Sequence, residues 1–345
     1  MQLHRGLIVG ILAMLALSAV LAGCDKAGNN SAPSPTASAD SPSPSPTASQ
    51  PSPSPTAKPD DNGQMVLEEF RGIVLADAPA DELNVKLDKA MAGVAPETAD
   101  ELVRELESYY EKNLPEVEKK FNADNVQKTL LKLKWPFTAD QTADIKDEKT
   151  RSLVEKTLAG GYKLETAEGY VFPILDYGAL KRFDDRVTPG MVAFIALMAL
   201  ESDSKSAEDG GLIITWEELA SRTLAAENYV RTYPQSKERV QAEQRFIQYL
   251  YSFLVGMDNT PIFQFETFKI DQKVKSTYEQ TIQANPDTAT AKMTQKLLDI
   301  LKKTEGAVFL KGKNGEKLDI PEVKQFRESI KKEARSMLDQ ASPAS

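Results

Sequence analysis

Histidine and cysteine are almost absent from this chain of 345 residues, which contains one of each, His4 and Cys24. The part of the chain after residue 24 therefore has no imidazole and no thiol. This excludes catalysis by Ser-His-Asp or Cys-His groups, zinc sites built on histidine or thiolate, haem ligation by histidine, and disulfide bonds. It also removes every side chain whose unperturbed pKa lies near neutrality. Any chemistry after residue 24 must use carboxylates, hydroxyls, amines or the backbone.

The chain also has no excess of positive charge and few long apolar runs. The formal net charge is −9, and no basic patch has interleaved aromatic residues, so we predict no nucleic-acid partner. The apolar run at residues 191–200 is too short for a membrane span, which needs about 20 residues, and predicts a buried helix. Neither a glycine-rich phosphate loop nor the spacing of an EF-hand calcium loop occurs. We therefore predict no cofactor and no metal.

The first residues follow the order of a secretory signal peptide. His4 and Arg5 precede an apolar stretch at residues 6–20, and the small residues Ala22 and Gly23 precede Cys24. A charged start, an apolar stretch of about 15 residues and a small-residue cleavage site predict a signal peptide over residues 1–23 rather than a membrane span. The alternative is an uncleaved apolar anchor that carries an incidental cysteine.

The run Leu21-Ala22-Gly23-Cys24 resembles the lipobox of bacterial lipoproteins. This resemblance implies that residues 1–23 are removed and that Cys24 carries a diacylglyceryl group, with acyl chains such as palmitate. Two acyl chains anchor a protein stably, whereas one binds marginally. The resemblance therefore implies a lipid-anchored protein on the extracytoplasmic face of the cell membrane, with the membrane as its partner through Cys24.

Residues 24–63 are predicted to form a lipidated N-terminus followed by a disordered tether. Nine of the twenty prolines lie between residues 33 and 59, among Ser, Thr and Ala. Such a segment has too little apolar surface to offset its ordering entropy. Frequent proline favours extended polyproline II, at about 3.1 Å per residue, so the tether can reach roughly 100 Å.

Residues 64–345 are predicted to form a helical extracytoplasmic domain. We predict a mainly α fold, either a helical bundle or an irregular helical array, with one or two small β-hairpins. Apolar residues at helical spacing, capping boxes at Thr138 and Thr215, and a break at Tyr233-Pro234 carry this prediction. The paired glycines at 160–161 and 210–211 are interpreted as helix stops. The predicted helices cover residues 81–91, 97–112, 124–133, 138–159, 191–200, 215–232, 236–254, 271–284, 288–304 and 321–339.

Two segments are predicted to form the hairpins. Residues 162–175 alternate polar and apolar side chains around a Glu168-Gly169 turn, and Asn314-Gly315 is a turn signal between residues 308 and 318. Residues 162–186 also interleave aromatic and charged side chains in a segment predicted to be non-helical, which suits a binding surface. The alternative is that the aromatic side chains pack the hairpin onto the helices. The candidate ligand-binding residues are Tyr170, Phe172, Asp176, Tyr177 and Arg182.

Two resemblances concern this domain. The segment Tyr233-Pro234-Gln235-Ser236 resembles the break in a tetratricopeptide-like helical hairpin, but the chain has one such unit and a solenoid needs about three. A second set of runs is similar to a group of uncharacterised lipoproteins of Gram-positive bacteria, over about residues 150–340. These runs are residues 161–170, Asp176-Tyr177, Glu201-Ser202-Asp203 and Ile214-Thr215-Trp216. No activity is attached to that group, so the likeness bears on localisation alone.

The composition favours a non-enzymatic binding or scaffold module whose partner is an envelope protein or a cell-wall polymer. The alternative is a cell-wall glycan hydrolase, because paired carboxylates cleave glycosides without histidine. Its candidate carboxylates are Glu165, Glu168, Asp176, Glu201 and Asp203. A third class, the two-lobed solute-binding proteins, requires alternating strands and helices, and that pattern is missing.

Anchoring through Cys24 is directly testable. We expect Cys24→Ser to abolish incorporation of labelled lipid and to block cleavage before residue 24, because the thiol is the only group there that forms a thioether. The measurement is metabolic lipid labelling followed by mass determination of the N-terminus. Continued labelling of the variant would contradict the lipoprotein assignment.

Overall fold

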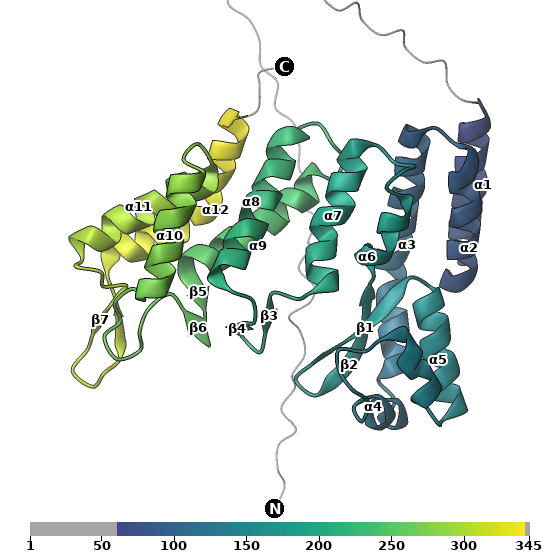
Figure 1. The fold of residues 1–345 in the computed structure, drawn as a ribbon, viewed down its shortest axis with the longest axis horizontal. Coiled ribbons are helices and arrows are strands. Elements are labelled where there is room, and N and C mark those ends of the chain that lie inside the picture. The colour runs from purple at the N-terminus through teal and green to yellow at the C-terminus, as the bar shows by residue number, and fades with distance from the viewer. Residues whose placement is uncertain (1–60, 342–345) are drawn as a thin grey trace, which may run out of the picture. The chain divides into compact units, whose positions relative to one another are not determined.

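The computed structural model describes residues 61–341 (Figure 1). The predicted signal peptide, Cys24 and the tether up to residue 60 lie outside the described residues. Residues 61–63, predicted as the end of the tether, instead form the start of the first helix. Within the described part the fold is mainly α, with small two-stranded antiparallel hairpins, which confirms the predicted fold class. No helix of this part is both long and apolar enough to cross a bilayer.

The elements follow one another in a simple order. The α-helices are α1 (Asp61–Leu75), α2 (Ala80–Ala90), α3 (Pro96–Phe121), α4 (Asp124–Leu130), α5 (Glu148–Ala159), α6 (Tyr177–Leu180), α7 (Pro189–Asp203), α8 (Trp216–Thr232), α9 (Arg239–Val255), α10 (Gln272–Ala284), α11 (Ala289–Lys303) and α12 (Pro321–Ala341). Short 3-10 helices occupy Met91–Gly93, Ala139–Asp144 and Lys181–Phe183. The hairpins pair β1 (Tyr162–Ala167) with β2 (Tyr170–Leu175), β3 (Ala207–Glu208) with β4 (Gly211–Leu212), β5 (Gly256–Met257) with β6 (Thr260–Pro261), and β7 (Phe309–Lys311) with β8 (Lys317–Asp319).

Several sequence signals lie where they were predicted. Thr215 caps α8 by accepting a hydrogen bond from the Glu218 N–H at 3.1 Å. The α8–α9 pair is broken at Tyr233, as expected from the proline that follows it. The Glu168-Gly169 turn connects β1 to β2, and both of its residues have positive φ, as a type I′ turn requires.

Three local predictions are wrong in detail. Helix α3 continues through Pro115 to Phe121, and the full burial of Phe121 offsets the backbone hydrogen bond that a proline removes. The capping box at Thr138 opens a 3-10 helix, and α5 begins separately with Asp147 as its cap. Gly210 does not end a helix: it follows Asp209 in the β3–β4 turn, and both have positive φ.

Two clusters of buried apolar side chains hold the helices together. The larger cluster runs from Leu67 on α1 to Leu338 on α12 and contains most of α7, which is apolar on every side. The smaller cluster lies where the end of α3 meets α4, α5 and the β1–β2 hairpin. Its buried members are Phe121, Val126, Leu130, Ile145, Val154, Leu164 and Val171.

Buried side chains from distant parts of the chain accept hydrogen bonds from groups at the starts of two helices. Asp100 on α3 accepts hydrogen bonds from the Thr188 N–H (2.9 Å) and hydroxyl (2.7 Å) at the start of α7. Glu227 on α8 accepts from the Ala289 and Thr290 N–H groups (2.6 and 2.9 Å) and from the Thr290 hydroxyl (2.7 Å) at the start of α11. The free N–H groups of a helix start attract a carboxylate. These two contacts therefore fix α7 on α3 and α11 on α8.

The contact of Glu227 gives a stability test. Glu227 is 1% exposed, so Glu227→Ala leaves buried N–H groups without acceptors, and we expect a loss of about 2–4 kcal/mol in the free energy of unfolding. The matched control is Glu279→Ala, because Glu279 is an exposed residue of α10 that pairs with Lys275 at 3.7 Å. That change should cost less than about 1 kcal/mol. Equal losses in urea unfolding would contradict the capping role.

Candidate binding surface

The structure separates the five candidate residues into two groups. Asp176, Tyr177 and Arg182 lie on or beside the helical turns of α6 and Lys181–Phe183, so the prediction that this part is non-helical is wrong. Tyr177 packs edge-on against Phe194 and donates a hydrogen bond to Glu107 at 2.8 Å. Asp176 caps α6 by accepting from the Ala179 N–H at 3.1 Å. These side chains are engaged inside the fold.

Arg182 is engaged in the same way. Its guanidinium donates to the Asn84 side chain at 3.0 Å, pairs with Asp88 at 3.1 Å and lies 4.2 Å from the centre of the Phe183 ring. It also donates to the Ala179 carbonyl at 2.8 Å. Its partners join α2 to the helical turns after β2, so a ligand would have to compete with several contacts for this side chain.

Tyr170 and Phe172 lie on the outer face of β2. The inner face places Val171 and Pro173 in buried positions, while Tyr170 is 39% exposed and Phe172 is partly exposed. In the register of the hairpin, Phe172 is opposite Glu165. The Tyr170 hydroxyl donates to the Asn122 side chain at the end of α3. These two residues are the candidates that face solvent.

Contacts between neighbouring hairpins extend this outer face into a continuous surface. Lys205, just after α7, donates to the Thr166 carbonyl of β1 at 2.6 Å and pairs with Glu165 at 3.3 Å. Lys205 directly precedes the β3–β4 hairpin, whose pairing is continued by the hydrogen bond from the Ile213 N–H to the Ser206 carbonyl at 3.0 Å. We call the surface formed by the three hairpins β1–β2, β3–β4 and β5–β6, together with Lys205, Ser206 and Ile213, the hairpin row. Figure 1 shows these hairpins along one edge of the helices.

Hydrogen bonds donated by backbone N–H groups continue the row from the β3–β4 hairpin to the β5–β6 hairpin. The Leu212 N–H donates to the Thr260 hydroxyl at 3.0 Å, and the Asn259 N–H donates to the Gly210 carbonyl at 2.9 Å. The second and third hairpins are therefore joined directly. The three hairpins are thus connected to one another, the first two through the Lys205 side chain and the last two through backbone N–H groups.

The row exposes apolar side chains that the sequence reasoning only partly found. Ile213 is 51% exposed and Tyr170 is 39% exposed, although most large apolar residues of the described part are buried. Ile213 was missed, although the apolar run Leu212-Ile213-Ile214 directly after Gly210-Gly211 is a signal that could have located it. An open surface with exposed apolar side chains suits a macromolecular partner better than a small ligand, which needs a concave site.

Most of the candidate carboxylates are held by other groups. Glu201 accepts from the Tyr249 hydroxyl (2.8 Å) and the Ser206 N–H (3.0 Å), and pairs with buried Arg222 at 3.3 Å. Asp203 pairs with Lys181 at 2.9 Å and Lys163 at 3.8 Å. Glu165 pairs with Lys205, Asp176 caps α6, and Glu168 lies exposed in the β1–β2 turn. These contacts are typical of structural ion pairs and helix caps.

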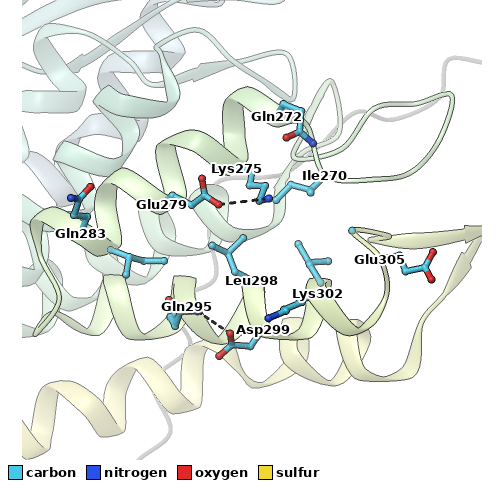
Figure 2. Close-up of a pocket in the computed structure, with 13 residues that line it drawn as sticks. Ile270, Gln272, Lys275, Glu279, Gln283, Gln295, Leu298, Asp299, Lys302 and Glu305 are labelled. Carbon is cyan, nitrogen blue, oxygen red and sulfur yellow. Dashed lines mark hydrogen bonds and ion pairs between the residues drawn. The ribbon is translucent and has the colours of Figure 1, made fainter.

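A recess of about 660 Å³ lies between α10 and α11 (Figure 2). Ile282, Leu298 and Leu301 contribute apolar surface to it, and polar side chains surround them. Some of the polar residues pair along their own helix, as Gln295 does with Asp299 at 2.9 Å. Among residues 61–341 no group of three or more Asp, Glu, His or Cys side chains is placed to hold a metal ion. The recess resembles the solvated faces of two neighbouring helices.

Glu107 is a titratable group that the sequence reasoning missed. Burial raises the pKa of its carboxyl to about 7, with a smaller contribution from the nearby carboxylates of Glu238 and Glu111 and against the hydrogen bond from Tyr177 and the charge of Arg104. Glu107 lies four residues after Val103 and three before Tyr110, so it shares a face of α3 with these two buried residues. This spacing was the signal available in the sequence. A carboxyl group thus titrates near neutrality in a region without histidine.

Comparisons with known proteins find no matching family model, no matching curated protein and no matching solved structure. A role for the hairpin row can therefore be inferred only from its geometry.

The raised pKa of Glu107 predicts a pH-dependent stability. The unfolded chain loses this proton near pH 4.5 and the folded chain near 7, so the stability contributed by this group falls between those values and is then constant. A shift of this size corresponds to about 3 kcal/mol at high pH. Glu107→Gln removes the ionisation and keeps an acceptor for Tyr177. We expect its stability, relative to the unsubstituted chain, to rise from pH 5 to pH 8.

The matched control for this experiment is Glu116→Gln, because Glu116 is an exposed residue of the same helix that pairs with Lys119. Its effect in urea unfolding should be small and should change little over the same pH range. The raised pKa would be contradicted if the difference in free energy of unfolding between Glu107→Gln and the unsubstituted chain stayed constant with pH.

Proposed function

We propose that this protein is a membrane-anchored extracytoplasmic lipoprotein that acts as a non-enzymatic binding or scaffold module, with the hairpin row as its binding surface. One observation carries the binding role: Ile213 and Tyr170 are exposed on a surface whose hairpins are joined to one another by hydrogen bonds. The resemblance of residues 21–24 to a lipobox supports the anchoring, and the Pro/Ser-rich segment would hold the domain away from the membrane.

The partner that best fits the row is a protein of the cell envelope. Exposed aliphatic and aromatic side chains with charged groups around them have the composition of a protein interface, with an apolar centre and a polar rim. A wall polymer is bound mainly through polar side chains that contact its hydroxyl groups. On this row Lys205 and Glu165 bind each other, and the unpaired carboxylates are confined to the turn residues Glu168, Asp209 and Asp258. We therefore favour a protein partner over a polymer.

The engagement of the candidate carboxylates supports a non-enzymatic role. A glycosidase needs one carboxylic acid that donates a proton and a second carboxylate that is free to attack or to activate water. Glu201 and Asp203 each contact cationic side chains, and Asp176 is used as a helix cap. Turnover on glycan would require these contacts to break first.

Partner retention by the anchored protein in its native envelope tests this function. We expect Tyr170→Ala and Ile213→Ala each to weaken retention of a cross-linked partner by more than about 1 kcal/mol, as hot-spot residues do. The melting temperature should change little, because both side chains are exposed. The control is Val240→Ala, since Val240 is 64% exposed on α9.

Two outcomes would contradict the proposal. Equal retention by all three variants would remove the hairpin row as the binding surface. Release of soluble fragments from purified wall polymer, lost when Glu201 or Asp203 is changed to its amide, would instead support the hydrolase. Tyr177→Ala provides a further comparison: it should lower stability by about 3–5 kcal/mol, because it removes a ring packed against Phe194.

A further inference from the structure

A small cavity of about 140 Å³ lies between the β5–β6 and β7–β8 hairpins and the helices α9, α11 and α12. Figure 1 shows β5, β6 and β7 at the same edge of the helices. The apolar lining of the cavity includes the buried side chains of Leu254, Ile262, Phe263, Leu297, Val308 and Val323. An engineered apolar cavity of about 150 Å³ binds benzene. This cavity therefore has room for one apolar group of the size of a leucine or phenylalanine side chain.

Two cationic side chains stand over aromatic rings at the cavity. The Lys317 ammonium group on β8 lies 5.5 Å from the centre of the Phe263 ring and 5.7 Å from the centre of the Phe309 ring. The Arg327 guanidinium group on α12 lies 4.6 Å from the centre of the Phe309 ring. Attraction between a cation and a ring face favours these positions. Because both side chains line the cavity, they are placed to bind a carboxylate that accompanies an apolar group.

The acidic group nearest to these cations leaves Lys317 unpaired. Asp319 pairs with Arg327 and, at 3.4 Å, with Lys324 on α12. Arg327 donates to Asp319 through one nitrogen, and a guanidinium group has further N–H donors. Lys317 pairs with no acidic side chain within residues 61–341. The cavity is thus bordered by one partly neutralised cation and one unpaired cation.

Among the described residues, the lining contains one acidic side chain, that of Asp258 in the turn between β5 and β6. This carboxylate is exposed and pairs with no cation of the described part, Lys317 included. Two unpaired charges of opposite sign, one from each hairpin, therefore line the same apolar cavity. A ligand that contacts both charges and fills the cavity carries a carboxylate, a cationic group and an apolar group.

We propose that this cavity binds a free α-amino acid with an apolar side chain. The side chain fills the cavity, Lys317 and Arg327 bind the α-carboxylate, and Asp258 binds the α-ammonium group. A residue within a peptide has lost one or both of these charges, so the free amino acid fits best. Small-ligand sites share this form, a mostly apolar concave site with a few convergent polar groups. The β5–β6 hairpin also belongs to the hairpin row, but neither Ile213 nor Tyr170 lines the cavity.

Calorimetric titration of the full-length chain, with Cys24→Ser to keep it free of lipid, tests the proposal. The probes are L-leucine and compounds that each lack one of its groups: 4-methylpentanoate lacks the ammonium group, 3-methylbutylamine lacks the carboxylate, and glycine lacks the side chain. We expect L-leucine to bind, and loss of either charge to weaken binding about tenfold, the factor that a hydrogen bond to a charged group contributes. Glycine should not bind. L-Alanine should bind more weakly than L-leucine by more than about tenfold, because each buried methylene contributes about fourfold.

Two variants assign the charges. Lys317→Gln should weaken the binding of L-leucine and 4-methylpentanoate about tenfold and leave 3-methylbutylamine unchanged. Asp258→Asn should weaken L-leucine and 3-methylbutylamine by a similar factor and leave 4-methylpentanoate unchanged. The matched controls are Lys313→Gln and Glu266→Gln, which remove exposed charges outside the lining and should leave all binding unchanged. The melting temperature of each variant should change little, because all of these side chains are exposed.

Three results would overturn the proposal. The first is no binding of L-leucine at millimolar concentration. The second is equal binding of L-leucine and 4-methylpentanoate, because the cavity would then take an apolar carboxylate rather than an amino acid. The third is binding of L-leucine that neither Lys317→Gln nor Asp258→Asn weakens, because it would then occur at another site. Tyr170→Ala and Ile213→Ala should not alter the binding of L-leucine, which separates this proposal from the proposed function.

Discussion

The fold depends on hydrogen-bond partners for the free backbone groups at the ends of many short, packed helices. Every helix leaves its first N–H groups and last carbonyl groups without partners within the helix, and burying one such group unpaired costs about 1–3 kcal/mol. Asp100 and Glu227 supply acceptors at the starts of α7 and α11. Tyr110 donates to the Gly160 carbonyl at 2.7 Å, and Tyr278 donates to the Phe253 carbonyl near the end of α9. Buried polar side chains therefore specify which helices pack together.

The connections between helices carry several of the exposed apolar side chains, whereas others, such as Val240 on α9, lie on the helices themselves. Tight turns such as Asp209-Gly210 let the chain reverse within a few residues, so four of the connections in the described part contain a short hairpin at the edge of the helices. A two-residue strand has no second sheet to cover its outer face, so side chains there stay in solvent. The helices supply a rigid support, and the connecting segments place side chains such as Ile213 in solvent.

Local chemistry made some of these features predictable and left others out of reach. The Thr215 cap, the Tyr233-Pro234 break and the Glu168-Gly169 turn each depend on neighbouring residues, so the sequence alone located them. The role of Glu107 depends on Tyr177, which is seventy positions away, and the joining of β4 to β6 depends on Leu212 and Thr260. Local patterns cannot reveal such long-range pairs. The same limit explains why Arg182, which contacts Asn84 and Asp88, resembled a binding residue in the sequence.

The smaller apolar cluster has a consequence for how the molecule opens. Its buried side chains come from residues 121–171 and pack among themselves, beside the larger cluster rather than within it. A separately packed group of elements can unfold locally at a free energy below that of the whole domain. The amide hydrogens of α4 and α5 should then exchange with solvent as one cooperative unit, while those of α7 and α9 exchange only through global unfolding. Residues 121–171 would be the first part of the described chain to become accessible to a protease.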